Sequence, residues 1–170
     1  GRLSKKYGVK NFVFASSCSV YGAAGNEAKS EDSPLNPLTT YAKSKIQCEQ
    51  GLKDLADNNF NITALRFATA CGFSPRLRLD LVLNDFVFNA VVNGKIDILS
   101  DGTPWRPLIH VRDMARAIEW ASIRPLQILD PYTVVNAGSN EWNFTVYELA
   151  EKVSKEIDNV QISVNSNAVK

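Results

Sequence analysis

The chain has 170 residues, of which 45% are hydrophobic and 22% are charged, values typical of a globular protein of one domain or slightly more. Its 19 Lys and Arg against 18 Asp and Glu give a net charge of +1, too small for the sustained positive field of a nucleic-acid-binding surface. The mostly apolar run at residues 79–92 is interrupted by Asp and Asn, so it falls short of the about 20 consecutive apolar residues that a membrane span needs. We therefore expect a soluble protein without a nucleic-acid or membrane partner.

Cysteine usage indicates a reducing compartment. Cys18, Cys48 and Cys71 are odd in number, and they lack the Cys-x-x-Cys spacing of a zinc site. The first ten residues are basic, but the apolar run that follows at residues 12–15 is too short for an export signal. The sequence therefore predicts reduced thiols, no metal site and a cytoplasmic location.

Apolar periodicity and turn residues predict the elements of the first part of the chain. A helix ends near Gly8, and a strand buried on both faces follows at residues 12–15. Residues 22–38 carry glycines, prolines and charges and are predicted to form a surface loop. Apolar and small residues then recur with a period close to 3.6 over residues 41–57, which indicates a helix capped by Thr39 or Thr40 and stopped at Asn58-Asn59. A second strand is predicted at 61–67.

The alternation of strands and helices continues in the second part of the chain. A loop at 72–75 leads to a predicted helix at 81–92, which ends at Asn93-Gly94. Further helices are predicted at 112–122 and 146–157, the latter opened by a capping box from Thr145 to Glu148. Short apolar runs indicate strands at 96–99, 108–111 and 134–135. This pattern predicts an α/β fold with a mainly parallel sheet.

Tyr41 and Lys45 form a candidate acid/base pair. They lie four residues apart at the start of the first long predicted helix, so their side chains emerge on one face within reach of each other. A phenol is a poor base at neutral pH, but a nearby ammonium group favours its phenolate form. The same spacing is common on exposed helices, so an ordinary surface pair is the alternative.

Four motifs follow one another in a specific order. They are Ser-Ser-Cys-Ser-Val-Tyr-Gly at 16–22, Tyr-Ala-Lys-Ser-Lys at 41–45, Leu-Arg-Phe at 65–67 with the Gly-Phe-Ser-Pro-Arg turn at 72–76, and Trp-Arg-Pro-Leu-Ile-His-Val-Arg-Asp at 105–113. Together they resemble the extended short-chain dehydrogenase/reductase family, specifically its nucleotide-sugar epimerases and dehydratases, over about residues 6–156. The resemblance implies the second half of a Rossmann-like dinucleotide-binding domain at 1–71 and 109–137, and a smaller substrate-binding portion at 72–108 and 138–170.

The resemblance also implies roles for individual residues. Tyr41 matches the catalytic tyrosine, Lys45 the lysine that binds the nicotinamide ribose, and Ser17 the Ser or Thr that hydrogen-bonds the reacting hydroxyl of the substrate. Ala68 matches a position that contacts the nicotinamide end of the cofactor through its backbone, with plain packing as the alternative. Arg106 matches an arginine that contacts the diphosphate of the nucleotide sugar, with a surface ion pair as the alternative. Ser17, Tyr41, Lys45 and Ala68 are therefore the expected cofactor contacts.

The implied activity is epimerisation of a nucleotide-diphosphate sugar through a keto intermediate, with NAD as cofactor and NADP still open. The implied assembly is a homodimer paired through the helix that bears Tyr41. Cys18 and Ser19 stand where the dehydratases of the family carry an acidic pair, which favours epimerisation over dehydration. A reductase, dehydratase or decarboxylase of the same family, or a non-catalytic nucleotide-binding or regulatory module, are the alternatives.

The sequence departs from the family pattern before the first motif. Gly8, Gly22 and Gly25 do not form the Gly-x-x-Gly-x-x-Gly turn that holds the cofactor pyrophosphate in the family. We therefore expect the carboxy-terminal part of a longer protein, nearly inactive by itself and with an exposed sheet edge. His110 is expected to be structural, and Asp113 is expected to cap the following helix or to pair with a neighbouring arginine.

Overall fold

The computed structural model describes residues 1–165 except residues 24, 26 and 129. The chain folds into two compact units. The first unit contains Gly1–Ala68 and Arg112–Gly138, and the second contains Thr69–Val111 and the chain from Ser139 onward. Within the described residues, each unit has its own helices and its own hydrogen-bonded strands.

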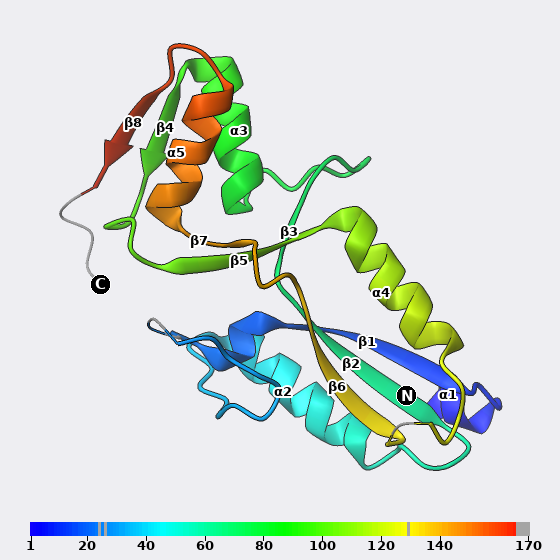
Figure 1. The fold of residues 1–170 in the computed structure, drawn as a ribbon. Coiled ribbons are helices and arrows are strands. Elements are labelled where there is room, and N and C mark those ends of the chain that lie inside the picture. The colour runs from blue at the N-terminus through cyan, green and yellow to red at the C-terminus, as the bar shows by residue number, and fades with distance from the viewer. Residues whose placement is uncertain (24, 26, 129, 166–170) are drawn as a thin grey trace. The chain divides into compact units, whose positions relative to one another are not determined.

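A three-stranded parallel sheet forms the centre of the first unit (Figure 1). It contains β1 (Asn11–Ser17), β2 (Asn61–Phe67) and β6 (Tyr132–Ala137), in the order β1-β2-β6. All seven residues of β2 are buried, as a central strand covered on both faces requires. Because the strands are parallel, their carboxyl ends lie at one edge of the sheet, and Ser17 and Ala68 both lie at that edge.

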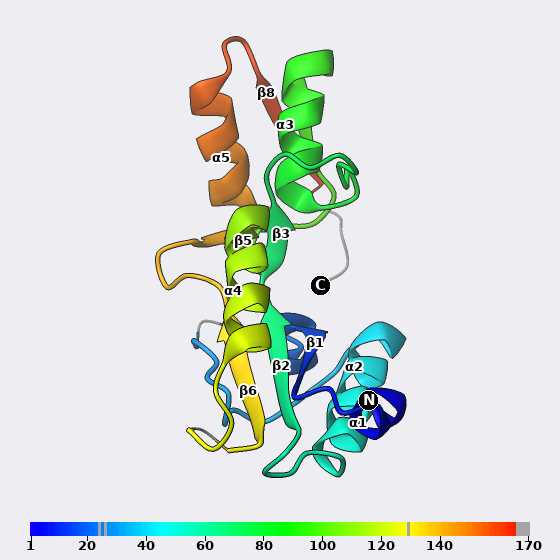
Figure 2. The ribbon, with the colours of Figure 1, turned by 90° about the vertical axis from the view of Figure 1, so that its right-hand side faces the viewer.

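Helices lie on both sides of this sheet. α1 (Arg2–Lys6) precedes β1, and the single turn of 3-10 helix η1 (Cys18–Tyr21) follows it. α2 (Thr40–Lys53) packs against β1 and β2 from one side, while α4 (Val111–Ile123) lies on the other side (Figures 1 and 2). Thr39 begins α2, because its Oγ1 accepts a hydrogen bond of 3.1 Å from the backbone N of Ala42.

The second unit contains two small groups of strands. β3 (Thr69–Cys71) pairs in parallel with β5 (Trp105–His110), which pairs antiparallel with β7 (Asn143–Thr145). β4 (Lys95–Ile98) pairs in parallel with β8 (Gln161–Val164). Four of the five strand pairs in the described residues are parallel, so the predicted α/β fold with mainly parallel pairing is confirmed.

Two amphipathic helices build the core of the second unit. α3 (Val82–Asn93) and α5 (Val146–Glu156) lie side by side next to β4. The buried side chains come from both helices and from the strands, and they include Phe86, Ala90, Ile96, Ile98, Leu149 and Val153. The predicted capping box is present: Thr145 Oγ1 accepts from the N of Glu148 at 3.1 Å, and Glu148 Oε2 accepts from the N of Thr145 at 2.8 Å.

Several predicted boundaries were wrong. The predicted helix at 41–57 ends at Lys53, because the chain turns back so that Asp57 and Phe60 exchange two backbone hydrogen bonds of 3.2 and 3.0 Å. The predicted strand at 108–111 begins at Trp105, and Val111 already belongs to α4. The three strands β3, β7 and β8 were not predicted, because none of them contains the apolar run that indicated the other short strands.

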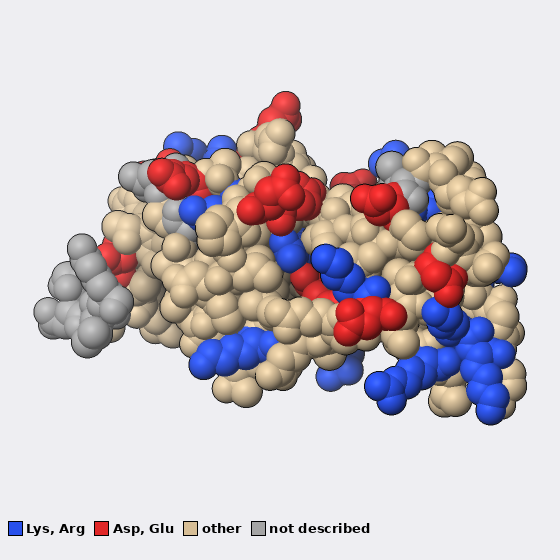
Figure 3. All heavy atoms as spheres, turned by 90° about the horizontal axis from the view of Figure 1, so that it is seen from below, with Lys and Arg blue, Asp and Glu red and all other residues tan. Residues whose placement is uncertain are grey.

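The surface carries mixed charge. On the face that Figure 3 shows, Lys and Arg side chains lie among Asp and Glu side chains. Five of the described ion pairs have partners that are partly or fully exposed to solvent, for example Lys5–Asp57 and Lys95–Asp97, both at 2.7 Å. Among the helices that the structure describes, none has the length and apolar character needed to cross a bilayer.

Candidate active site

Lys45 lies beside both Tyr41 and the end of β1. Its Nζ donates a hydrogen bond of 2.8 Å to the carbonyl oxygen of Ala15. The same atom lies 5.3 Å from the centroid of the Tyr41 ring and 5.0 Å from that of the Phe14 ring. An ammonium group has three N–H donors, so two are left after the bond to Ala15. The structure therefore brings the two residues of the candidate pair together, with donors available for a phenolate or a ligand hydroxyl.

The Tyr41 hydroxyl is accessible to a ligand. Tyr41 is the second residue of α2, directly after the capped first position, and its side chain is 55% exposed. It takes part in none of the side-chain hydrogen bonds that join the described residues, whereas its backbone oxygen accepts from Ser44 Oγ at 2.7 Å. The hydroxyl is therefore not held by a protein partner in this arrangement and is free to exchange a proton with a ligand.

Ser17 ends β1 and caps η1. Its Oγ accepts hydrogen bonds from the backbone N of Ser19 at 3.2 Å and from Ser19 Oγ at 2.9 Å. A serine hydroxyl has two lone pairs and one proton, so these bonds occupy the acceptor capacity and leave the proton to be donated. Ser17 is thus oriented as a hydrogen-bond donor at the carboxyl edge of the sheet.

The other two predicted contact residues have different surroundings. Ala68 is 8% exposed, and its N–H is used by the sheet, since it donates to the Ala137 carbonyl at 2.9 Å. Its carbonyl oxygen is the backbone group left for a ligand. Arg106 lies in β5 of the second unit, is exposed, and donates from Nη1 to the carbonyl of Trp105 at 2.8 Å. No carboxylate pairs with it among the described residues, so the alternative of a surface ion pair is not seen there.

A buried polar cluster next to these residues was missed by the sequence analysis. The guanidinium of Arg66 on β2 forms a bidentate ion pair with Glu49 on α2, and both side chains are 5% exposed. Burial lowers the pKa of Arg66, but hydrogen bonds to Glu49 and Tyr21 outweigh this effect and raise it overall. Arg66 therefore carries its charge at any physiological pH. The spacing of charged residues along the sequence did not predict this ion pair, because Glu49 and Arg66 lie 17 positions apart in different elements.

His110 and Asp113 have structural surroundings. A Cβ atom at Gly72, where φ is +98°, would lie 2.4 Å from His110 Nε2, so the ring closes over this glycine within the second unit. Arg116 Nη1 lies 3.3 Å from Asp113 Oδ1, which confirms the predicted pairing with a neighbouring arginine. Burial raises the pKa of Cys71, so its thiol stays protonated. Within the described residues, no group of three or more potential metal ligands is found.

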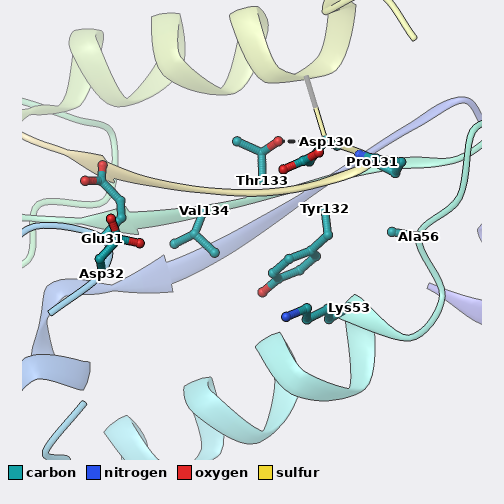
Figure 4. A pocket seen from close by; sticks show the side chains of 9 residues that line it. All are labelled: Glu31, Asp32, Lys53, Ala56, Asp130, Pro131, Tyr132, Thr133 and Val134. Atoms are coloured by element: carbon teal, nitrogen blue, oxygen red, sulfur yellow. Dashed lines mark hydrogen bonds between the residues drawn. The ribbon is translucent and has the colours of Figure 1, made fainter. Parts of the chain in front are cut away.

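A cavity of about 630 Å³ opens between β6 and α2 in the first unit. Tyr132 points from β6 toward Lys53 on α2, with Glu31 and Asp32 at the far end of the cavity (Figure 4). Burial and then the negative charge of Glu49 raise the pKa of Tyr132 to about 12, against an opposing effect of Arg66. None of the five predicted site residues lines this cavity, so it is separate from the candidate site.

Comparisons with known proteins identify the family. The model of the NAD dependent epimerase/dehydratase family matches residues 2–138. A curated relative, UDP-glucose 4-epimerase of Bacillus subtilis, is 37% identical over 128 residues, which are 65% of this chain and 38% of the relative. The chain spans less than half the length of the curated relatives it matches.

Solved structures are also similar to this chain. UDP-N-acetylglucosamine 4-epimerase from Methanobrevibacter ruminantium M1, solved with UDP-N-acetylmuramic acid, has a TM-score of 0.78 and 26% identity, covering 98% of this chain and 54% of that one. MoeE5 in complex with UDP-glucose and NAD has a TM-score of 0.76 and 27% identity, covering 99% and 56%. These matches agree with the Rossmann-like fold expected from the motifs. Because the family model covers most of its length, the chain belongs to the NAD dependent epimerase/dehydratase family.

Proposed function

We propose that this chain is the catalytic part of a longer enzyme that epimerises a nucleotide-activated sugar with NAD as cofactor. The observation that carries the proposal is the placement of Lys45 Nζ 5.3 Å from the Tyr41 ring and hydrogen-bonded to the end of β1, in a chain of this family. The printed names of its relatives support the substrate class, since they include UDP-glucose and UDP-N-acetylglucosamine 4-epimerases.

Three side chains have different roles at the sugar hydroxyl. The Tyr41 hydroxyl, as phenolate, takes the proton from the sugar hydroxyl while the hydrogen on the same carbon leaves as hydride. The Lys45 ammonium stabilises the negative charge on the phenolate oxygen. Ser17 donates its free proton to the reacting oxygen and so orients it. For the carbon to be inverted, Tyr41 would give the same proton back to the oxygen when hydrogen is added to the opposite face of that carbon.

The residues present fit the nicotinamide end of NAD. Lys45 has two uncommitted N–H donors for the ribose hydroxyls, and the carbonyl of Ala68 is free at the same edge of the sheet. When bound, NAD accepts and returns the hydride, which none of the side chains of the protein can do. The pyrophosphate of the cofactor requires backbone amides at a helix N-terminus, and the glycine turn that supplies them in the family is not among these residues.

Arg106 is proposed to bind the diphosphate of the substrate. Its guanidinium is exposed and has one N–H engaged with a backbone carbonyl, which leaves further donors for paired hydrogen bonds to phosphate oxygens. The proposal therefore assigns the proton transfer and cofactor contacts to residues of the first unit and the diphosphate contact to Arg106 of the second unit.

Epimerisation is favoured over dehydration by the turn after β1. Elimination of water requires a carboxylic acid or a comparable proton donor close to the sugar, and this turn offers Cys18 and Ser19 instead. The Ser19 hydroxyl is already engaged with Ser17 at 2.9 Å. A reductase of the same family and a non-catalytic binding module are tested by the experiment below.

The homodimer and the cytoplasmic location belong to the same proposal. α2 buries two of its residues, Ala42 and Glu49, and leaves most of the others exposed, which suits a helix that pairs with a second copy. None of the three cysteines forms a disulfide bond among the described residues, as a reducing compartment requires.

A product survey tests the proposal. The longer protein that contains this chain is incubated with NAD and with UDP, GDP, CDP and dTDP sugars, and the products are identified by NMR. We expect inversion at one ring carbon of at least one of these sugars, without loss of water. Cofactor binding without conversion of any sugar would favour the binding module, and net reduction of NAD to NADH with oxidation of a sugar, the reverse of reductase turnover, would favour a reductase.

A further inference from the structure

The Glu49–Arg66 ion pair joins the helix that bears Tyr41 to the central strand. Arg66 Nε and Nη2 donate to the two carboxylate oxygens of Glu49 at 3.1 and 2.7 Å. A buried ion pair is a weak source of stability, because an apolar pair of similar size often gives an equally stable or more stable protein. The bidentate geometry, in contrast, fixes direction as well as distance. This pair is therefore suited to hold α2 in one orientation on β2.

Glu49 shares a face of α2 with the candidate pair. It lies four residues after Lys45 and eight after Tyr41, so the three side chains follow one another along successive turns. A rotation or a shift of α2 that carried Tyr41 and Lys45 away from β1 would also break the bidentate contact of Glu49 with Arg66. The position of the candidate pair and the integrity of the ion pair are thus geometrically linked.

The same ion pair holds the turn that carries Ser17. On one side of Ser17, the hydroxyl of Ser16 donates to Glu49 Oε1 at 2.5 Å. On the other side, Arg66 Nη1 donates to the hydroxyl of Tyr21, the last residue of η1, at 2.8 Å, and the guanidinium lies over the Tyr21 ring. Ser17 and η1 are therefore tied to the ion pair at both ends.

The segment between this turn and α2 is tied to the same cluster. Arg66 Nη1 donates to the carbonyl of Glu31 at 3.1 Å, and the carboxylate of Glu31 accepts from the backbone N of Asn136 at 2.7 Å. Asn136 in turn accepts a bond of 2.6 Å from the Tyr21 hydroxyl and donates one of 3.1 Å to the Lys29 carbonyl. The cluster thus also holds residues 29 and 31, which lie between Ser17 and Tyr41 in the sequence.

We propose that Glu49 and Arg66 are positioning residues for the reaction, which hold α2 and the turn after β1 so that Tyr41, Lys45 and Ser17 meet at one substrate hydroxyl. The inference rests on the proposed function, since it assigns these three residues to the chemistry. Because a displacement of about 1 Å in a reacting group can cost about 100-fold in rate, the pair contributes to turnover through geometry and touches no substrate atom.

The test uses the longer protein with variants that separate geometry from stability. The double variant Glu49→Leu/Arg66→Met replaces the pair with apolar side chains of similar size and removes the bonds to Ser16 and Tyr21. Tyr21→Phe removes one hydroxyl from the cluster. The matched control is Thr63→Val, because Thr63 lies on the same strand, is 1% exposed and bonds to Arg124 outside the cluster at 2.9 Å.

Two readouts are compared. We expect the double variant to fold, to lose about 10-fold or more in kcat and to keep the KM for the nucleotide sugar, with a smaller loss for Tyr21→Phe and an unchanged kcat for Thr63→Val. Amide hydrogen exchange should accelerate in the residues that the cluster holds, namely 16–21, 29–31, 40–49 and 136, and not elsewhere in the double variant. Unchanged kcat in the folded double variant overturns the inference. If that variant does not fold, Arg66→Lys, which keeps the charge without the bidentate geometry, is measured in its place.

The failure of this inference is distinguishable from that of the proposed function. If the unsubstituted protein converts no nucleotide sugar, the proposed function fails, and hydrogen exchange, which needs no substrate, decides on the cluster. Faster exchange confined to residues 16–21, 29–31, 40–49 and 136 supports the positioning role. Exchange that is unchanged, or that rises equally along the whole chain, overturns it.

Discussion

Tyr41 owes its proposed role to its neighbours as much as to its own chemistry. Tyr41 is largely exposed, its hydroxyl makes no hydrogen bond with the residues that the structure describes, and the Lys45 ammonium lies beside its ring. The carbonyl of Ala15 fixes the position of that ammonium group. The proposed function assigns the exchange of a proton with the substrate hydroxyl to Tyr41 in this setting.

The first prediction concerns the Tyr41 hydroxyl. In the longer protein, Tyr41→Phe should lower turnover by about 100-fold or more, because the general base is lost, while the substrate still binds. Steady-state kinetics and equilibrium binding of the nucleotide sugar measure the two effects separately. Tyr7→Phe is the matched control, since Tyr7 is 79% exposed on the residues that follow α1. Equal turnover in both variants would remove Tyr41 from the mechanism.

The second prediction concerns Tyr132 and alkaline pH. The folded state raises the pKa of Tyr132 from 10.0 to about 12, chiefly through burial. Between these values the folded protein keeps a proton that the unfolded chain has lost, so the free energy of unfolding falls as the pH rises through this window. Tyr132→Phe should therefore lose less stability across the window than the unsubstituted chain. Urea unfolding midpoints of both proteins, measured below and within this pH window, give the loss of stability. An equal loss of stability in the two proteins would contradict the prediction.

The sequence was informative about residues that lie close together along the chain. Tyr41, Lys45 and Ser17 belong to short motifs, and the structure brings the first two together. The cluster of Glu49, Arg66 and Asn136 was not predictable in this way, because its members come from α2, β2 and β6 and meet only after the sheet has formed. Local spacing carries no information on such contacts.

At the scale of single elements, periodicity located the helices better than the strands. The capping box before α5 was predicted because both partners lie within four residues of each other. The end of α2 was misplaced, since apolar residues continue to Ala56 although the chain leaves the helix after Lys53 to form the turn at Asp57. Strands of three or four residues, such as β3 and β7, are defined by their partners, and a single sequence does not show these.

The third prediction concerns the first turn of α5. Thr145→Ala removes the oxygen that accepts from the Glu148 amide, which should destabilise the helix by about 1 kcal/mol. Thr145→Ser keeps that oxygen and should retain most of the stability. Urea unfolding of the two variants checks the difference, and equal destabilisation of both would show that the cap contributes nothing.

At the scale of the whole molecule, each unit has its own set of buried residues. In the first unit they centre on β2, and in the second on α3, α5 and β4. The fold class followed from the alternation of elements. The division of the described strands into three separate sheets did not, because pairing depends on contacts between distant segments.

The fourth prediction concerns the core of the second unit. Leu149 is 2% exposed, so Leu149→Ala should cost about 2–5 kcal/mol and should increase hydrogen exchange in α3, α5 and β4. Leu149→Met keeps the volume of the side chain and should cost less than about 1.5 kcal/mol. Unchanged exchange in these three elements after Leu149→Ala would contradict the assignment of Leu149 to this core.

The most direct test of the proposed epimerisation uses a nucleotide sugar deuterated at the ring carbon that is inverted. The longer protein is incubated with this sugar and NAD, and NMR follows both the configuration of the carbon and its deuterium. The proposed chemistry predicts an inverted carbon that keeps its deuterium, because the hydride leaves and returns within one catalytic cycle. Exchange of the deuterium for solvent hydrogen, or no inversion in the presence of bound cofactor, would contradict it.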